Sequence, residues 1–179
     1  MKTMKLLFLF LGLTALASTL QAFDPDPGDK DQLAAAKAII EIKAADPSIQ
    51  SFFDDSAAYA VFPSVGKGGI GIGGAYGKGL VIADDKVIGK TELTQVTIGF
   101  QLGGQVYSEF IFFKDDAALA QFQRGNFELG AQASAVAATA GASADVGYDK
   151  GVAIFTVTGG GLMYEATVSG QKFDYEDVQ

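Results

Sequence analysis

Residues 63–83 read Pro-Ser-Val-Gly-Lys-Gly-Gly-Ile-Gly-Ile-Gly-Gly-Ala-Tyr-Gly-Lys-Gly-Leu-Val-Ile-Ala, and this ribbon decides the fold. From residue 70 onward the bulky side chains fall on even positions, whereas the odd positions hold glycine, alanine and one valine. Glycine weakens a strand unless a bend, a bulge or close backbone contact requires it. We therefore expect the rest of the domain to pack tightly against the bare face. A straight ribbon would be about 50 Å long, so it should bend or fold back, with Gly73-Gly74 as the expected turn.

The composition is that of one folded domain. The chain has 179 residues, of which 49% are hydrophobic and 19% are charged, so it can bury a core of its own. It contains neither cysteine nor histidine. Disulfides, Ser-His-Asp or Cys-His nucleophiles and the usual zinc sites are therefore excluded. We expect no catalytic residue, no metal and no cofactor.

The first 22 residues have the pattern of a cleavable export signal. Lys2 and Lys5 precede an apolar run that ends near Ala17, and Ala22 offers a small residue at the cut. This run is too short to span a bilayer comfortably, so we expect a periplasmic or secreted protein without a transmembrane anchor. All 21 acidic residues follow the signal and two of the 13 basic ones precede its end, which leaves a net charge of −10. That charge argues against nucleic acid as a partner.

Hydrophobic periodicity predicts helices and strands in the remaining chain. Residues 23–30 form a linker, a helix follows over 31–45, and Asp46-Pro47 ends it and begins a second helix. A further helix should begin at Asp115. Strands are expected over 57–62, 94–103, 105–113, 152–158 and 162–168, with a turn at 84–86 and a polar tail at 173–179. Residues 131–144 are rich in alanine and permit either a helix or a strand.

Two segments match the sequence pattern of a nucleotide-binding motif in part, but both lack the features that such a motif requires. Gly69-x-Gly71-x-x-Gly74 should close a strand and open a helix, but strand-like sequence follows it. Gly89-Lys90-Thr91 lacks the first glycine of a phosphate loop. Acid chemistry remains a possibility that the sequence leaves open, because nothing in it brings two carboxylates together. The acids considered are Glu92, Glu109, Glu128, Asp145 and Glu165.

Several segments together resemble the SYLF-domain family. They are Val61-Phe62-Pro63 with the glycine ribbon that follows, then residues 97–105 (Thr-Ile-Gly-Phe-Gln-Leu-Gly-Gly-Gln), then residues 127–131 (Phe-Glu-Leu-Gly-Ala). They occur in the family's order, and the resemblance runs from about Leu33 to Phe173. This is the lipid-binding family that includes the yeast-type actin-binding proteins.

The resemblance implies a single SYLF-like domain over residues 31–179. Its fold class would be α+β, with a strongly bent, mostly antiparallel β-sheet or barrel-like core, N-terminal helices and one inserted helix packed on it. It also favours a strand for residues 131–144 and implies non-catalytic binding of acidic phospholipid. Actin, which some family members bind, is not expected as a partner of an exported protein. The sequence also departs from the family pattern by being acidic, so the headgroup preference stays open.

We therefore predict a phospholipid or membrane surface as the partner. The apolar face of the first helix would enter the interface while nearby cations touch phosphate. The residues proposed for this contact are Lys37, Ile39, Ile42, Lys43, Lys67, Lys78 and Arg124, with Lys90 beside them. Packing of the helix on the sheet is the other reading of its apolar face.

Two further functions remain open. One is a structural or protein-binding envelope module, or a self-associating one, whose bare glycine face receives another chain. The other is a carboxylate-based hydrolase, which requires two acids about 5 to 10 Å apart in a pocket.

Overall fold

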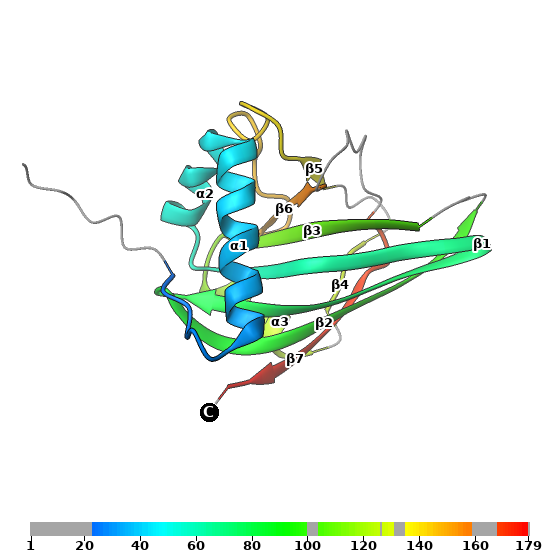
Figure 1. The fold of residues 1–179 in the computed structure, drawn as a ribbon, viewed down its shortest axis with the longest axis horizontal. Helices are drawn as coiled ribbons and strands as arrows, with labels where there is room; N and C mark the ends of the chain where they lie inside the picture. The colour runs from blue at the N-terminus through cyan, green and yellow to red at the C-terminus, as the bar shows by residue number, and fades with distance from the viewer. Residues whose placement is uncertain (1–22, 100–103, 126, 131–134, 159–167, 179) are drawn as a thin grey trace, which may run out of the picture.

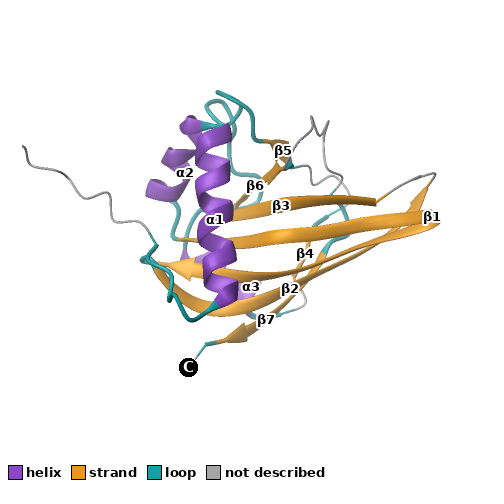
Figure 2. Ribbon diagram, viewed as in Figure 1, coloured by secondary structure: helices purple, strands orange, loops and turns teal. Residues whose placement is uncertain are grey.

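The computed structural model describes residues 23–99, 104–125, 127–130, 135–158 and 168–178. It is an α+β domain in which helices pack on both faces of one sheet (Figures 1 and 2). The helices are α1 (Lys30–Ala45), the short 3₁₀ turn η1 (Pro47–Ile49), α2 (Gln50–Asp55) and α3 (Asp116–Gln123). The strands are β1 (Ala58–Ala83), β2 (Lys86–Gly99), β3 (Gly104–Phe113), β4 (Phe127–Glu128), β5 (Val136–Ala137), β6 (Val152–Val157) and β7 (Lys172–Asp177).

Strand β1 is 26 residues long and folds back on itself. A Cβ placed on Gly77 would lie 2.9 Å from the Val65 side chain, although residues 65 and 77 of a straight strand would be about 40 Å apart. A Cβ on Gly69 would lie 2.2 Å from the Cα of Gly73, so the chain reverses between these two glycines. The predicted reversal is confirmed, and it lies slightly before the expected Gly73-Gly74. We call residues 58–68 the first arm of β1 and residues 72–83 its second arm.

The two arms lie at the centre of a strongly curled sheet. Its strands follow the order β4-β7-β2-β1-β3-β6-β5, in which the second arm of β1 pairs with β2 and the first arm pairs with β3. Every pairing is antiparallel except the short one between β5 and β6. Asp84 and Asp85 take positive φ in the tight turn between β1 and β2, where a turn was predicted. The predicted fold class is confirmed.

Helix α1 covers one half of one face of the sheet, which we call the α1 face (Figure 1). Asp29 caps the helix by accepting hydrogen bonds from the backbone amides of Asp31 and Gln32. The buried side of the helix packs with α2 on apolar residues of β1, β3 and β6. The core of this face includes Ile39, Ile42, Phe52, Tyr59, Val61, Leu80, Ile82, Phe110, Phe112 and Phe155. Among the described residues, no helix lies over the other half of the face, near the β1 reversal (Figure 2).

The opposite face, the α3 face, is concave. The rings of Phe62 on β1 and Phe173 on β7 lie 5.6 Å apart between centroids, although β2 and the second arm of β1 separate their strands. In a flat sheet such strands would be about 14 Å apart. Phe122 of α3 fills the hollow and lies 5.5 Å from Phe173. The bare glycine side of the ribbon is this face, and the close packing expected there is confirmed, because a Cβ on Gly79 would lie 2.7 Å from the Phe62 ring.

Asp46 joins the helical layer to a loop far along the chain. As predicted, it ends α1 and caps the next turn, where its carboxylate accepts from the backbone amide of Ser48. The same carboxylate accepts from the amides of Gly141 at 3.0 Å and Ser143 at 2.7 Å. Burial alone would raise the pKa of Asp46, but the hydrogen bonds from Ser48, Ser143 and Gly141 hold it below its usual value.

Three expectations about the strands need correction or completion. Residues 172–177, expected within a polar tail, form β7, because Phe173 is buried against Phe62 and Phe122. In β2 the apolar Val96 is exposed, whereas the polar Gln95 is buried. Residues 135–144 contain the two-residue strand β5 and turns. Residues 131–134 and most of the strand predicted at 162–168 lie outside the described part.

Candidate functional site

Exposed apolar side chains gather on the uncovered half of the α1 face. Ile72 is 71% exposed, Val96 is 77% exposed and Val106 is 65% exposed. Ile72 pairs with residue 98 while Val96 pairs with Gly74, so the two are diagonal neighbours on adjacent strands. We call Ile72, Tyr76, Val96 and Val106, together with the glycines between them, the apolar end.

Glycines form the floor of the apolar end. Val106 of β3 pairs with Gly66 of the first arm. Val65 on the first arm of β1 lies against Gly77 on the second arm. The two arms run antiparallel, so the same register places Gly66 beside Tyr76 and Gly68 beside Gly74. A Cβ on Gly66 would have nothing within 4 Å, so packing does not require glycine there. The missing side chains instead leave bare backbone between exposed apolar groups.

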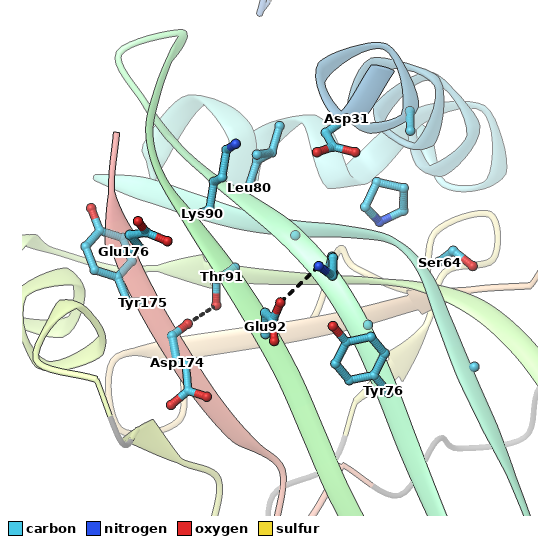
Figure 3. A pocket seen from close by; sticks show the side chains of 16 residues that line it. Asp31, Ser64, Tyr76, Leu80, Lys90, Thr91, Glu92, Asp174, Tyr175 and Glu176 are labelled. Carbon is cyan, nitrogen blue, oxygen red and sulfur yellow. Dashed lines mark hydrogen bonds and ion pairs between the residues drawn. The ribbon is translucent and has the colours of Figure 1, made fainter. Parts of the chain in front are cut away.

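A groove of roughly 820 Å³ lies between the apolar end and the first turns of α1 (Figure 3). Gly66 and Tyr76 belong to both features, so the groove continues the apolar end toward the helix. Leu80 and Ala34 line its inner part, next to the backbone of Gly77 and Gly79. The charged side chains along the groove are Asp31, Lys78, Lys90, Glu92, Asp174 and Glu176.

The charges in the groove come mainly from paired positions on β1, β2 and β7. Lys78 forms an ion pair with Glu92, with Nζ and Oε1 3.2 Å apart (Figure 3). The hydrogen bond from this ammonium to Glu92 raises the pKa of Lys78. Glu92 in turn lies directly opposite Asp174 in the β2–β7 pairing, so the two acidic residues lie on the same face of the sheet. The hydroxyl of Thr91 donates to the Asp174 carbonyl oxygen at 2.7 Å and fixes β7 here.

The structure places the two predicted apolar site residues of α1 inside the protein. Ile42 is completely buried and Ile39 nearly so, both in the core of the α1 face. The sheet occupies that side of the helix, so Ile39 and Ile42 cannot enter a lipid interface while the domain is folded, and this prediction is wrong. The exposed side of α1 instead carries Leu33 and Ile40.

The five predicted cationic residues do not converge. Lys37 is exposed and pairs with Glu41 at 3.6 Å, and Lys43 lies over the Phe53 ring, 4.3 Å from its centroid. Burial lowers the pKa of Lys43, which the carboxylates of Asp54 and Asp85 partly offset. Lys67, Lys78 and Arg124 lie apart from one another, on the α3 face, in the groove and after α3.

The α3 face holds a buried polar cluster around Glu109. The Gln171 amide donates to Glu109 Oε2 at 3.0 Å and lies 3.5 Å from the Tyr107 hydroxyl. The other carboxylate oxygen, Oε1, has no hydrogen-bond partner in the part of the chain that the structure describes. Burial raises the pKa of Glu109 to about 7, although the Gln171 amide, Lys67 and Tyr107 favour its charged form.

The acids considered from the sequence are not gathered in one site. Glu92 lies in the groove, Glu109 lies on the α3 face and Glu128 pairs with Lys172 at 3.8 Å. Asp145 is exposed in the loop before β6, and Glu165 lies outside the described residues. Glu92 and Asp174, which occupy opposed positions on adjacent strands and both line the groove, were not predicted as a pair because only the β2–β7 pairing relates them.

Sequence reasoning also missed the apolar end. Val96 and Val106 lie in strands that alternate between apolar and other residues, which was visible in the sequence. The side that faces solvent depends on how far the strands extend beyond α1, which crosses them (Figure 1), and no pattern within the strands records this arrangement. Within the described ranges, no helix is both long enough and apolar enough to cross a bilayer.

The comparisons with known proteins agree with the resemblance. Residues 94–177, from the middle of β2 through β7, match the Ysc84 family, described as Las17-binding protein actin regulator. A curated relative, Beta cell expansion factor A of Aeromonas veronii, is 29% identical over 142 residues, which cover 78% of this chain and 53% of that protein. The chain thus spans about half the length of this relative. Residues 94–177 are thus similar to the Ysc84 or SYLF-domain family, a family of binding domains that are generally non-enzymatic.

Proposed function

We propose that this domain binds phospholipid surfaces at the cell envelope through its apolar end and performs no catalysis. The observation that carries the proposal is the exposure of Ile72, Val96 and Val106 on one uncovered half of a sheet face. Exposed aliphatic side chains grouped on one face of a sheet mark a candidate site for contact with a membrane or another protein. The glycine floor supports this function, because it lets a flat lipid surface approach the backbone.

The energetics favour weak, reversible binding. Each of the three aliphatic side chains would contribute about 1 to 2 kcal/mol on burial, since a full transfer contributes about 1.5 to 3 kcal/mol. Their sum of about 3 to 6 kcal/mol corresponds to a dissociation constant between roughly tens of micromolar and several millimolar. The net charge of −10 opposes approach to an anionic bilayer. Apolar contact, rather than long-range attraction, must therefore drive the association.

Flotation with phosphatidylcholine vesicles tests the proposal, because uncharged vesicles remove the long-range repulsion. The variant Ile72→Gln/Val96→Gln should lose at least tenfold in vesicle partitioning, from about 1 kcal/mol or more for each residue. The matched control is Ile40→Gln on α1, since Ile40 is 68% exposed and lies away from the apolar end. The control should float as the parent protein does. Equal flotation of all three proteins would exclude the apolar end as the binding surface.

The envelope location rests on the predicted export signal in residues 1–22, which precede the described chain. N-terminal sequencing of the protein from the native cell would detect a start at Phe23 if the signal is cleaved. Export would separate the protein from actin, which the family description names as the target of regulation. A protein partner remains the alternative, and failure of flotation together with a stable complex in cross-linking from the envelope would favour it.

A further inference from the structure

The groove beside the apolar end has the charges of a headgroup site, but not of one for anionic lipid. Its lining includes four carboxylates, Asp31, Glu92, Asp174 and Glu176, and two ammonium groups, Lys78 and Lys90. The lining therefore carries a negative balance, within a chain that is itself acidic. An anionic headgroup would meet repulsion in this groove, whereas a group that carries its own positive charge would be attracted.

The two lysines already have acidic neighbours. Lys78 is 3.2 Å from Glu92, and Lys90 lies directly opposite Glu176 in the β2–β7 pairing. Lys90 also lies near Asp29, the N-cap residue of α1. The pKa of Asp29 is lowered mainly by hydrogen bonds from the backbone amides of Gln32 and Asp31, and the positive charge of Lys90 lowers it further. Both ammonium groups can contact a phosphate, but neither is an isolated positive site.

The carboxylates of Glu92 and Asp174 supply the opposite feature. They stand on directly opposed residues of adjacent antiparallel strands, and both line the groove. Like charges in directly opposed positions destabilise a sheet. Lys78 compensates for one of the two carboxylates. A second cation bound between them would remove the remaining repulsion.

Tyr76 provides a further contact for a cation. It lines the groove at its border with the apolar end, and Figure 3 shows its side chain beside Glu92 with the hydroxyl turned toward that residue. Aromatic faces attract ammonium groups, and recognition of quaternary ammonium commonly combines such a face with nearby acids. Because the groove continues the apolar end, a lipid whose chains meet Ile72 and Val96 would bring its headgroup to this position.

We infer that the groove binds a phospholipid headgroup that carries an ammonium group, of the ethanolamine or choline class, with the ammonium at Glu92, Asp174 and Tyr76 and the phosphate toward Lys78 and Lys90. This inference rests on the proposed lipid function and adds the class of headgroup. The shared chemistry is a phosphate joined through two carbons to a positive nitrogen.

The first experiment uses soluble headgroups, so that it does not depend on membrane insertion. Glycerophosphoethanolamine and glycerophosphocholine are titrated into the isotope-labelled protein and compared with glycerophosphoglycerol, which lacks the ammonium. Amide resonances of residues 76–79 and 90–92 should shift with at least one of the two amines, at threefold or more lower concentration than with glycerophosphoglycerol. Equal shifts with all three compounds, or no shifts, would overturn the inference.

Matched variants assign the effect to the groove. Asp174→Asn should weaken the amine titration at least threefold, because it removes a carboxylate without changing the backbone bond to Thr91. Glu41→Gln removes the same charge from the exposed side of α1, outside the groove, and should leave the titration unchanged. An equal effect of the two variants would reduce the result to net charge and refute the site.

Vesicle flotation then separates this inference from the proposed function. If Asp174→Asn reduces binding to phosphatidylethanolamine-containing vesicles but not to phosphatidylglycerol-containing ones, both the lipid function and the headgroup class are supported. Flotation that requires Ile72 and Val96 but does not distinguish these vesicles would keep the function and refute the headgroup class. Headgroup titration without any flotation would refute the membrane function and keep the site.

Discussion

Ionisation of Glu109 should reduce the stability of the domain near neutral pH. Its carboxyl is completely buried on the α3 face, and burial raises its pKa to about 7, compared with 4.5 for an exposed glutamate. A pKa that is higher in the folded state means that folding disfavours the charged form. The protein is therefore most stabilised at this site below pH 4.5, and the contribution is lost as pH rises from 4.5 to about 7.

The size of this loss follows from the two pKa values. A difference of about 2.5 units corresponds to about 3 kcal/mol, which is a large part of the 5 to 15 kcal/mol typical of a domain. Glu109→Gln removes the titration while keeping an acceptor for the Gln171 amide. At pH 8 the variant should gain up to about 3 kcal/mol relative to the parent, compared with their difference at pH 4.5.

Urea unfolding of both proteins at several pH values between 4.5 and 8 measures this difference. Other carboxyl groups also affect stability: Asp46, whose pKa is lowered, contributes stability that is lost as pH falls below about 4. Such effects are common to both proteins and cancel in the comparison. The variant also buries an amide in place of an unpartnered oxygen, which shifts its stability equally at all pH values. A difference between the proteins that stays constant across this range would refute the reasoning.

Two further predictions concern packing and capping. Gly79→Ala should destabilise the domain by about 2 kcal/mol or more, because the new Cβ would lie 2.6 Å from the Val61 carbonyl oxygen. The control Gly66→Ala should change the unfolding midpoint little, because a Cβ there has nothing within 4 Å. Equal unfolding midpoints for the two variants would contradict the reversal of β1. Asp46→Asn should cost about 2 to 4 kcal/mol in denaturant unfolding, because the amide cannot accept all the bonds from Ser48, Gly141 and Ser143. Retained stability in that variant would show that the 139–146 loop is not held by this carboxylate.

Local signals in the sequence predicted the elements well. Asp46-Pro47 and Asp84-Asp85 mark a helix boundary and a turn by their own backbone chemistry, independent of anything distant. The glycines of the ribbon likewise predicted a chain reversal and a tightly packed face. In the structure, other parts of the chain lie so close to Gly77 and Gly79 that a side chain would not fit there. These inferences needed only neighbouring residues.

The errors concern which surface each element covers. The apolar stripe with Ile39 and Ile42 is equally suitable for lipid or for a sheet, and the sequence does not record that the sheet lies beneath it. Val96 alternates like a core residue, yet it lies on the half of the α1 face that α1 does not cover and is exposed. Phe173 lies in a polar segment that forms a strand, because its ring packs against Phe62 and Phe122, which are distant in the sequence. Each outcome depends on contacts between elements far apart in the chain.

The position of Phe173 also has a consequence for the order in which the domain is completed during synthesis. Both arms of β1, together with β2 and β3, can pair as soon as residue 113 has emerged, because their turns are short. Phe62, Phe122 and Phe127 would lack the cover of Phe173 until β7 has emerged, since the Phe173 ring lies against all three. A nascent chain whose synthesis pauses before β7 would therefore expose an aromatic surface on the α3 face to chaperones and proteases.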